Sequence, residues 1–223
     1  MLYGFELKGL TPLLIHADDV EASDRLGEWR KDAKNKNLSV PGDDRSPAWT
    51  WQTYLYTDGQ VLTVPTDNLM VSLRQAGATM ILKKSTTFKS ITQSGLLMTT
   101  EHLPIEVNGK TISVAAVASI EGMFREHTEA VQKLGFRLFV KRARVNKSKH
   151  IRVRPRFDVW SLRGQVEVLA EREMPLEVLQ ELFTIAGTGK GLCDWRPSSP
   201  ASPGVFGRFS ATVRPAGNGK KKR

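Results

Sequence analysis

Alternating apolar and polar positions mark the first and last parts of the chain as strands. In residues 2–8, Tyr3, Phe5 and Leu7 alternate with glycine and charged residues, which is the period of a half-buried strand. Residues 208–214 repeat this pattern with phenylalanine, alanine and valine on the apolar side. We expect both segments to pair in a sheet that buries one face.

Two other segments have the period of a helix. Apolar residues recur at helical spacing from 69 to 80, where Thr66 or Asp67 is expected to cap the helix. A second apolar stripe runs through 176–186, and Gly187 is well placed to end that helix. Each helix has one apolar side with which it can cover a sheet.

Shorter segments complete the predicted core. Strands are expected at 103–107, 112–117 and 157–169, and Asn108-Gly109 between the first two is typical of a hairpin turn. The order is then strand, helix, strands, helix, strand. This order predicts the α+β class with a ferredoxin-like (RRM-like) β-α-β-β-α-β core.

The polar stretches between these elements are read as large insertions, at about 17–62 and 83–150, in a single domain covering residues 1–216. The first insertion is rich in turn residues and contains scattered tryptophans. The tail, 217–223, is glycine-rich and basic, and we expect it to be disordered.

The charge balance narrows the choice of partner. The chain has 33 lysines and arginines against 23 aspartates and glutamates, a formal net charge of +10. A clustered basic excess favours a polyanion such as nucleic acid, over an inert basic surface or a protein of the membrane surface. No apolar run reaches the roughly 18 residues that span a bilayer, so no membrane partner is expected.

Cys193 is the single cysteine. It allows neither an intrachain disulfide nor a cysteine-based zinc site, which fits a reducing cytoplasm. The first residues carry charge where a signal peptide would be apolar. A cytoplasmic location is therefore expected, with no metal and no cofactor.

Two stretches concentrate cations. Residues 137–156 contain nine arginines and lysines and no acidic residue, which favours an anionic ligand over a solvated hairpin because the cations would repel one another. Arg152, Arg154 and Arg156 alternate, so they would share one face of a strand. In 83–89, lysines and threonines surround Phe88, which would either stack on a base or lie in the core.

The glycine-rich stretch 187–209 is the third candidate. Glycine permits close approach of the backbone to a ligand, and Lys190, Arg196 and Arg208 add charge suited to phosphate. Trp195 would either contact the ligand or lie in the core. The stretch resembles a P-loop only superficially, because Thr184 replaces a required glycine and the segment follows a helix.

An acid–base or metal role is the alternative for His16, Asp18 and Asp19. Their chemistry suits general base catalysis or divalent metal binding, but polar turn residues have the same composition. Other signatures of hydrolases, G-x-S-x-G and H-E-x-x-H, do not occur. A non-catalytic protein is expected, and a ribonuclease is the less favoured reading.

Three segments together resemble a known family. They are the opening strand with Leu10-Thr11-Pro12-Leu13-Leu14-Ile15-His16, the helix entry Val64-Pro65-Thr66-Asp67-Asn68-Leu69-Met70-Val71-Ser72-Leu73-Arg74, and the glycine-rich loop from Gly187 to Phe209. In this order they resemble the RAMP superfamily, the RNA-binding subunits of CRISPR effector complexes, and within it the repeating backbone subunit. Asp67 and Asn68 replace small residues of the family pattern, and the loop is longer by the stretch 198–203. A compact or phage-borne relative fits the resemblance as well as a standard subunit.

The resemblance implies a function. Family backbone subunits bind guide RNA on the sheet side through phosphate contacts without sequence preference, multimerise along it, present it for target pairing, and kink it with a thumb-like hairpin. Here the thumb would lie in 83–101 or 140–152. The implied partners are guide RNA, target nucleic acid, further copies of the chain and other CRISPR effector subunits. The residues expected to bind RNA are Arg74, Lys83, Lys84, Thr86, Lys89, Arg142, Arg144, Lys147, Arg152, Arg154, Lys190, Trp195, Arg196 and Arg208.

Two other functions stay open at this stage. A RAMP-type metal-dependent endoribonuclease would use an aspartate of the first insertion or His16. A phage protein that binds single-stranded nucleic acid, or that inhibits a CRISPR complex by mimicking its subunit, would share the basic surface.

Overall fold

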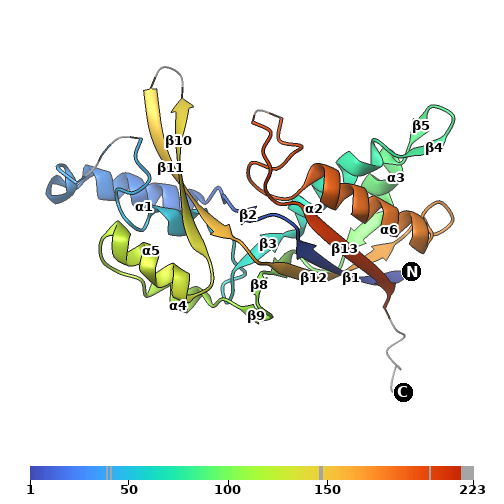
Figure 1. Cartoon of the computed structure of the whole chain (residues 1–223), viewed down its shortest axis with the longest axis horizontal. Helices are drawn as coiled ribbons and strands as arrows, with labels where there is room; N and C mark the ends of the chain where they lie inside the picture. Colours follow the sequence, from blue (N-terminus) through green and yellow to red (C-terminus); the bar gives the residue numbers. More distant parts are fainter. Residues whose placement is uncertain (39, 41, 146–147, 201, 217–223) are drawn as a thin grey trace.

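The computed structural model describes residues 1–38, 40, 42–145, 148–200 and 202–216. The protein is of the α+β class, with several antiparallel sheets and, in the described ranges, six α-helices. Figure 1 shows helices α2, α3 and α6 beside the largest sheet, and α1, α4 and α5 around a long hairpin at the other end of the molecule. The predicted disorder of 217–223 concerns residues outside the described ranges.

The largest sheet is built around the first strand. Strand β1 (Leu2–Gly9) pairs antiparallel with β13 (Phe209–Pro215) on one side and with β12 (Ser161–Val168) on the other. Beyond β12 lie β6 (Leu96–Met98) and β8 (Glu106–Val107), and β8 pairs with β9 (Lys110–Thr111). The strands expected at 2–8 and 208–214 are confirmed, and the strand expected at 157–169 is shorter.

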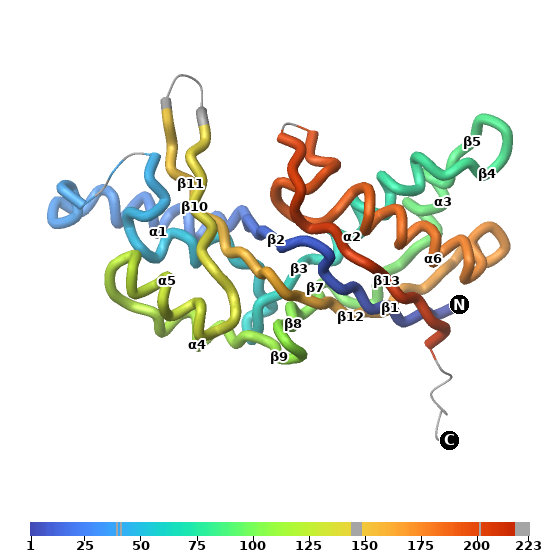
Figure 2. The backbone as a smooth tube through the Cα atoms, viewed as in Figure 1, coloured from blue at the N-terminus to red at the C-terminus, as the bar shows by residue number. Residues whose placement is uncertain are grey.

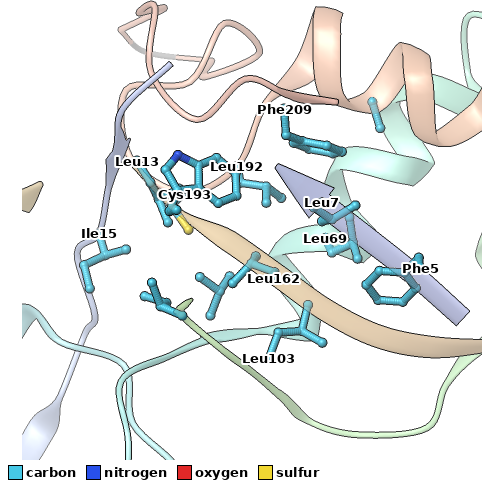
Figure 3. Packing of buried hydrophobic residues seen from close by; sticks show 14 of the residues in the cluster. Phe5, Leu7, Leu13, Ile15, Leu69, Leu103, Leu162, Leu192, Cys193 and Phe209 are labelled. Atoms are coloured by element: carbon cyan, nitrogen blue, oxygen red, sulfur yellow. The ribbon is translucent and has the colours of Figure 1, made fainter. Parts of the chain in front are cut away.

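The apolar sides of these strands face two helices. In the register, Phe5 lies opposite Gly164 and Val213, so one face of the sheet is apolar, and α2 (Thr66–Gly77) and α6 (Leu176–Ile185) cover it. Figure 3 shows Phe5, Leu7, Leu69, Leu162 and Phe209 packed in this core. Both predicted helices are confirmed because their apolar stripes match the apolar face of the sheet.

The ends of these helices differ from the expectation. Thr66 is the first helical residue, and its hydroxyl donates to the Glu101 carbonyl at 3.2 Å; Pro65 stands at the cap position. Neither Thr66 nor Asp67 caps the helix. Gly187 does not end α6 either, because a π-helical turn, η3 (Ala186–Lys190), follows and ends at Gly191 with φ +75°.

A second sheet contains the long hairpin. Strands β10 (Arg137–Val145) and β11 (Ser148–Phe157) pair along their length, and β11 also pairs with β2 (Leu13–Leu14). The first insertion is more ordered than its composition indicated. It forms α1 (Val20–Lys31) and the 3-10 turns η1 (Ala33–Asn35) and η2 (Thr50–Tyr54), and Trp51 lies in the core.

The middle of the chain forms smaller elements, which are β3 (Thr63–Pro65) paired with β7 (His102–Pro104), the hairpin β4 (Ile81–Lys83) and β5 (Thr86–Thr87), and helices α3 (Lys89–Ser94), α4 (Val114–Ala118) and α5 (Phe124–Lys133). The predicted turn at Asn108-Gly109 is confirmed, with φ values of +52° and +76°. The strand expected at 112–117 is wrong, because Ser113 caps helix α4 there. None of the described helices is long and apolar enough to cross a membrane.

Candidate nucleic-acid interface

Near its base, the hairpin β10–β11 has one mainly apolar face and one cationic face. Phe139 lies opposite Arg154, and Lys141 opposite Arg152, so these four side chains lie on the same face of the hairpin. On the other face, Val153 is fully buried against the core. The prediction that the alternating arginines share a face is confirmed.

Arg154 lies at the base of this cationic face. Its guanidinium donates from Nε to Asp194 at 2.8 Å and from Nη1 to Asp44 at 3.4 Å and to the Val153 carbonyl at 2.8 Å. Its side chain is 8% exposed. Arg154 therefore joins the first insertion, the hairpin and the segment before β13, and it is not free to contact phosphate.

Other arginines of the hairpin are also neutralised. Arg152 Nη1 lies 3.0 Å from Asp44, and both Arg137 and Arg156 pair with Asp158. The expectation of cations without counter-charge is therefore wrong for these residues. The acidic partners lie outside 137–156, so the composition of the run alone did not reveal them.

Three aromatic rings connect the hairpin to the segment 191–208, which we call the C-terminal loop. The ring centroid of Phe139 is 6.0 Å from that of Trp195 and 5.6 Å from that of Phe206, and Trp195 and Phe206 are 6.5 Å apart. All three rings are half-buried. We call them the aromatic cluster. Figures 1 and 2 show the hairpin and the C-terminal loop rising on the same side of the molecule.

Cations lie over these rings. Lys141 Nζ is 4.5 Å from the Trp195 centroid, and Arg156 Cζ is 5.6 Å from Phe139 and 5.9 Å from Phe206. Such distances give cation–π attraction. The rings thus hold positive charge beside half-exposed apolar surface, which is the pairing that single-stranded nucleic acid uses.

Backbone geometry fixes the C-terminal loop. Cys193 and Trp195 have φ values of +59° and +47°, a left-handed conformation that is uncommon for residues other than glycine. A Cβ on Gly204 would lie 2.0 Å from the Trp195 carbonyl oxygen, and one on Gly207 would lie 2.1 Å from the Leu192 carbonyl oxygen. These glycines are needed for the loop to close on itself, and they orient Trp195. Burial raises the pKa of the Cys193 thiol to about 12.

The predicted cations of the loop are half-exposed. Arg196 donates from Nη1 to the Cys193 carbonyl at 2.9 Å and from Nε to the Ser198 hydroxyl at 3.1 Å, and Arg208 donates to the Thr188 carbonyl. In the described ranges, no ion pair joins Lys141, Arg142, Lys190, Arg196 or Arg208 to an acidic side chain. Their charge is available to a ligand.

Three other residues of the hairpin were predicted to bind RNA, namely Arg142, Arg144 and Lys147. Arg142 is exposed on β10, but it lies opposite Ile151 and therefore on the other face of the hairpin from Lys141 and Arg152. The side chain of Arg144 and the whole of Lys147 lie outside the described part of the structure. Of the predicted thumb at 140–152, the structure therefore describes two strands and not the turn.

A second basic surface lies at the other end of the molecule. Lys83, Lys84, Thr86 and Lys89 are exposed around the β4–β5 hairpin, which Figure 1 shows far from β10–β11. Phe88 is 7% exposed and belongs to the core, so it does not offer a ring to a base. Arg74 is exposed on α2.

The three candidate catalytic residues have different surroundings. Asp19 caps α1 by accepting from the Ala22 N–H at 3.1 Å, and Asp18 is exposed. His16 packs edge-on against Tyr54 at 4.6 Å, and burial lowers its pKa, with Arg154 adding to the effect. Within the described ranges, no group of three or more histidine, cysteine or acidic side chains is placed to hold a metal ion.

The uncovered face of the large sheet is polar and nearly balanced in charge. A shallow hollow of about 490 Å³ there is lined by residues that include Glu6, Arg163, Gln165, Thr212 and Arg214. Arg163 pairs with Glu6 at 2.7 Å and with Glu106 at 2.6 Å. This hollow therefore offers a polyanion less than the hairpin side does.

Sequence reasoning did not single out Phe139 or Lys141 as ligand contacts, nor Asp44 as an ion-pair partner of the hairpin arginines. The sequence pattern could have indicated Phe139 and Lys141, because they are two positions apart in a strand, as Arg152 and Arg154 are in the strand that pairs with it. Asp44 gave no signal in the sequence, because its partners lie about a hundred positions away and only the fold brings them together.

No protein-family model matches the chain, and no curated protein sequence matches it.

Proposed function

We propose that the protein binds single-stranded RNA on the surface formed by the β10–β11 hairpin and the C-terminal loop. One observation carries the proposal: segments about fifty residues apart in sequence bring half-exposed aromatic rings and unpaired cations together on one side of the molecule. Phosphates would contact Lys141, Lys190, Arg196 and Arg208. The β4–β5 surface has similar charge but no exposed ring, so we assign the binding to the hairpin side.

We further propose that the core is ferredoxin-like. The strands β13, β1, β12 and β6 are neighbours in this order, all antiparallel. In sequence they follow the order β1, α2, β6, β12, α6, β13, with both helices on one face. This agrees with a split β-α-β arrangement. Strands β8 and β9 and the hairpin sheet are additions to it.

The family assignment is part of the same proposal. The three sequence segments that resemble the RAMP superfamily fall on β1 and its exit, on the start of α2, and on the loop before β13. A long hairpin on the side of that loop agrees with a thumb in 140–152 rather than in 83–101. We propose a backbone subunit that multimerises along a CRISPR guide RNA and presents it to a target with other effector subunits.

The test has two readouts. Fluorescence anisotropy with a labelled single-stranded RNA of mixed sequence should give an affinity that falls steeply between 50 and 200 mM salt, because released counterions contribute much of the binding free energy. Protein purified at moderate salt should carry RNA of uniform length in a particle much larger than one chain.

Other results would contradict the proposal. RNA binding that does not change with salt would exclude phosphate contacts as its basis. A monomer without nucleic acid would exclude the guide-coating role. Shortening of the RNA with added Mg²⁺ would point instead to the ribonuclease.

A further inference from the structure

Trp195 has an unusual combination of position and surroundings. It is half-buried, so part of its ring is accessible, and its backbone is held at φ +47°. Phe139 meets its ring edge-on at 6.0 Å, with an interplanar angle of 79°. Neither Phe139 nor Phe206 stacks parallel on the indole, since the interplanar angles are 79° and 43°.

A flexible lysine side chain, that of Lys141, lies over one face of this indole. Lys141 Nζ lies 4.5 Å from the ring centroid, and Lys141 is exposed and has no acidic partner in the described ranges. A lysine ammonium on a flexible stem can leave this position at low cost. Arg154, which lies 5.9 Å from the same ring, cannot leave because Asp44 and Asp194 hold it.

We infer that Trp195 is a stacking site for one unpaired nucleobase, and that Lys141 occupies the place of the base in the free protein. This inference rests on the proposed function and deepens it. On binding, the base stacks on the indole and the Lys141 ammonium moves to an adjacent phosphate. A base within a duplex is already stacked on both faces, so the site selects single strands.

The surroundings favour a base over a purely anionic ligand. A phosphate gains nothing from an aromatic face, whereas a nucleobase stacks on it. The backbone at Cys193 and Trp195 is held in an uncommon left-handed conformation beside close glycine contacts, and the ring at this position is half-buried. The cost of this strain is understandable if the ring has a ligand.

The experiment compares two ligands with the same phosphates. The first is a ten-nucleotide oligouridylate, and the second is an abasic ribose-phosphate chain of the same length. The unmodified protein should bind the oligouridylate about 5- to 150-fold more tightly, the range that corresponds to one stacked base. Trp195→Leu should lose most of this difference and keep its affinity for the abasic chain.

A matched variant controls for loss of a tryptophan. Trp49 is also half-buried and carries a cation, with Arg25 Cζ 4.3 Å from its centroid, and it belongs to neither the hairpin nor the C-terminal loop. Trp49→Leu should keep the preference for the oligouridylate. Thermal melting of each variant checks the fold.

The outcomes separate the two proposals. Equal affinity of the unmodified protein for both ligands would overturn the stacking site and leave phosphate binding intact, even if Trp195→Leu failed to fold. Absence of binding to either ligand would overturn both proposals. A preference for oligouridylate that Trp195→Leu retains in full would also overturn the stacking site.

Discussion

Replacement of Arg154 by methionine tests how the two parts of the proposed surface are held together. The guanidinium contacts Asp44 of the first insertion and Asp194 of the C-terminal loop. Methionine has a similar length and an apolar side chain, so it keeps most of the packing and removes the charge. We expect a large loss of stability from this one change.

The structure sets the size of this loss. Asp44 is 5% and Asp194 23% exposed, so removal of Arg154 leaves carboxylates partly without compensation. Breaking a buried ion pair by removing one partner costs about 3–5 kcal/mol. Asp44 keeps Arg152 at 3.0 Å and the Val153 N–H at 3.1 Å, so we expect the lower end, about 3 kcal/mol.

Urea unfolding, monitored by tryptophan fluorescence, measures the loss of stability in Arg154→Met. With a slope of about 2 kcal/mol per molar urea, the midpoint should fall by roughly 1.5 M. Adding Asp194→Asn should recover part of the loss, because Arg154 is the only cation paired with Asp194 in the described ranges. Arg163→Met is the control, since Arg163 also pairs with two acids but is exposed, and its midpoint should move far less. An unchanged midpoint for Arg154→Met would refute the reasoning.

Two further changes act at buried positions. His127 accepts a hydrogen bond from Trp51 Nε1 at 3.0 Å, and burial lowers the pKa of its imidazole. As the pH falls, this histidine is therefore protonated in the unfolded chain before it is protonated in the folded one. The free energy of unfolding should then decrease as pH drops below about 6.5. Calorimetry at pH 7.5 and 5.5 should show this fall, and His127→Gln should reduce it; an equal fall in the variant would contradict the assignment. Gly187→Ala would place a Cβ 2.1 Å from the Phe209 carbonyl oxygen, and the melting temperature should drop by roughly 5 °C. Gly189→Ala, which meets open space, should melt close to the unmodified protein, and equal melting of the two variants would argue against the close approach.

The helices and strands that could be predicted from the sequence are those whose apolar residues recur with a regular period. Residues 2–8, 66–77 and 176–185 have one apolar side each, and burial of that side determines the element. Helix α1 had no such signal, since none of its residues is buried. Its start depends on the Asp19 cap, which looked like one polar turn residue among several.

Of the candidate site, the sequence predicted the basic segments but not which cations are free. The charges of Arg152 and Arg154 are neutralised by Asp44 and Asp194, which lie far away in sequence. Fold-dependent pairing of this kind cannot be read from the local composition. The role of Phe139 likewise depends on the contact between the hairpin and the C-terminal loop.

The most direct test of the central claim compares two variants that each lose three positive charges. One carries Lys141→Ala, Lys190→Ala and Arg196→Ala on the hairpin side, and the other carries Lys83→Ala, Lys84→Ala and Lys89→Ala at the opposite end. The affinity of each for single-stranded RNA is measured against salt. We predict that the first variant loses affinity and that its slope of log K against log salt becomes shallower by about 2, at about 0.7 for each lost phosphate contact, while the second keeps nearly the slope of the unmodified protein. Equal effects of the two variants, or a larger effect of the second, would contradict the account.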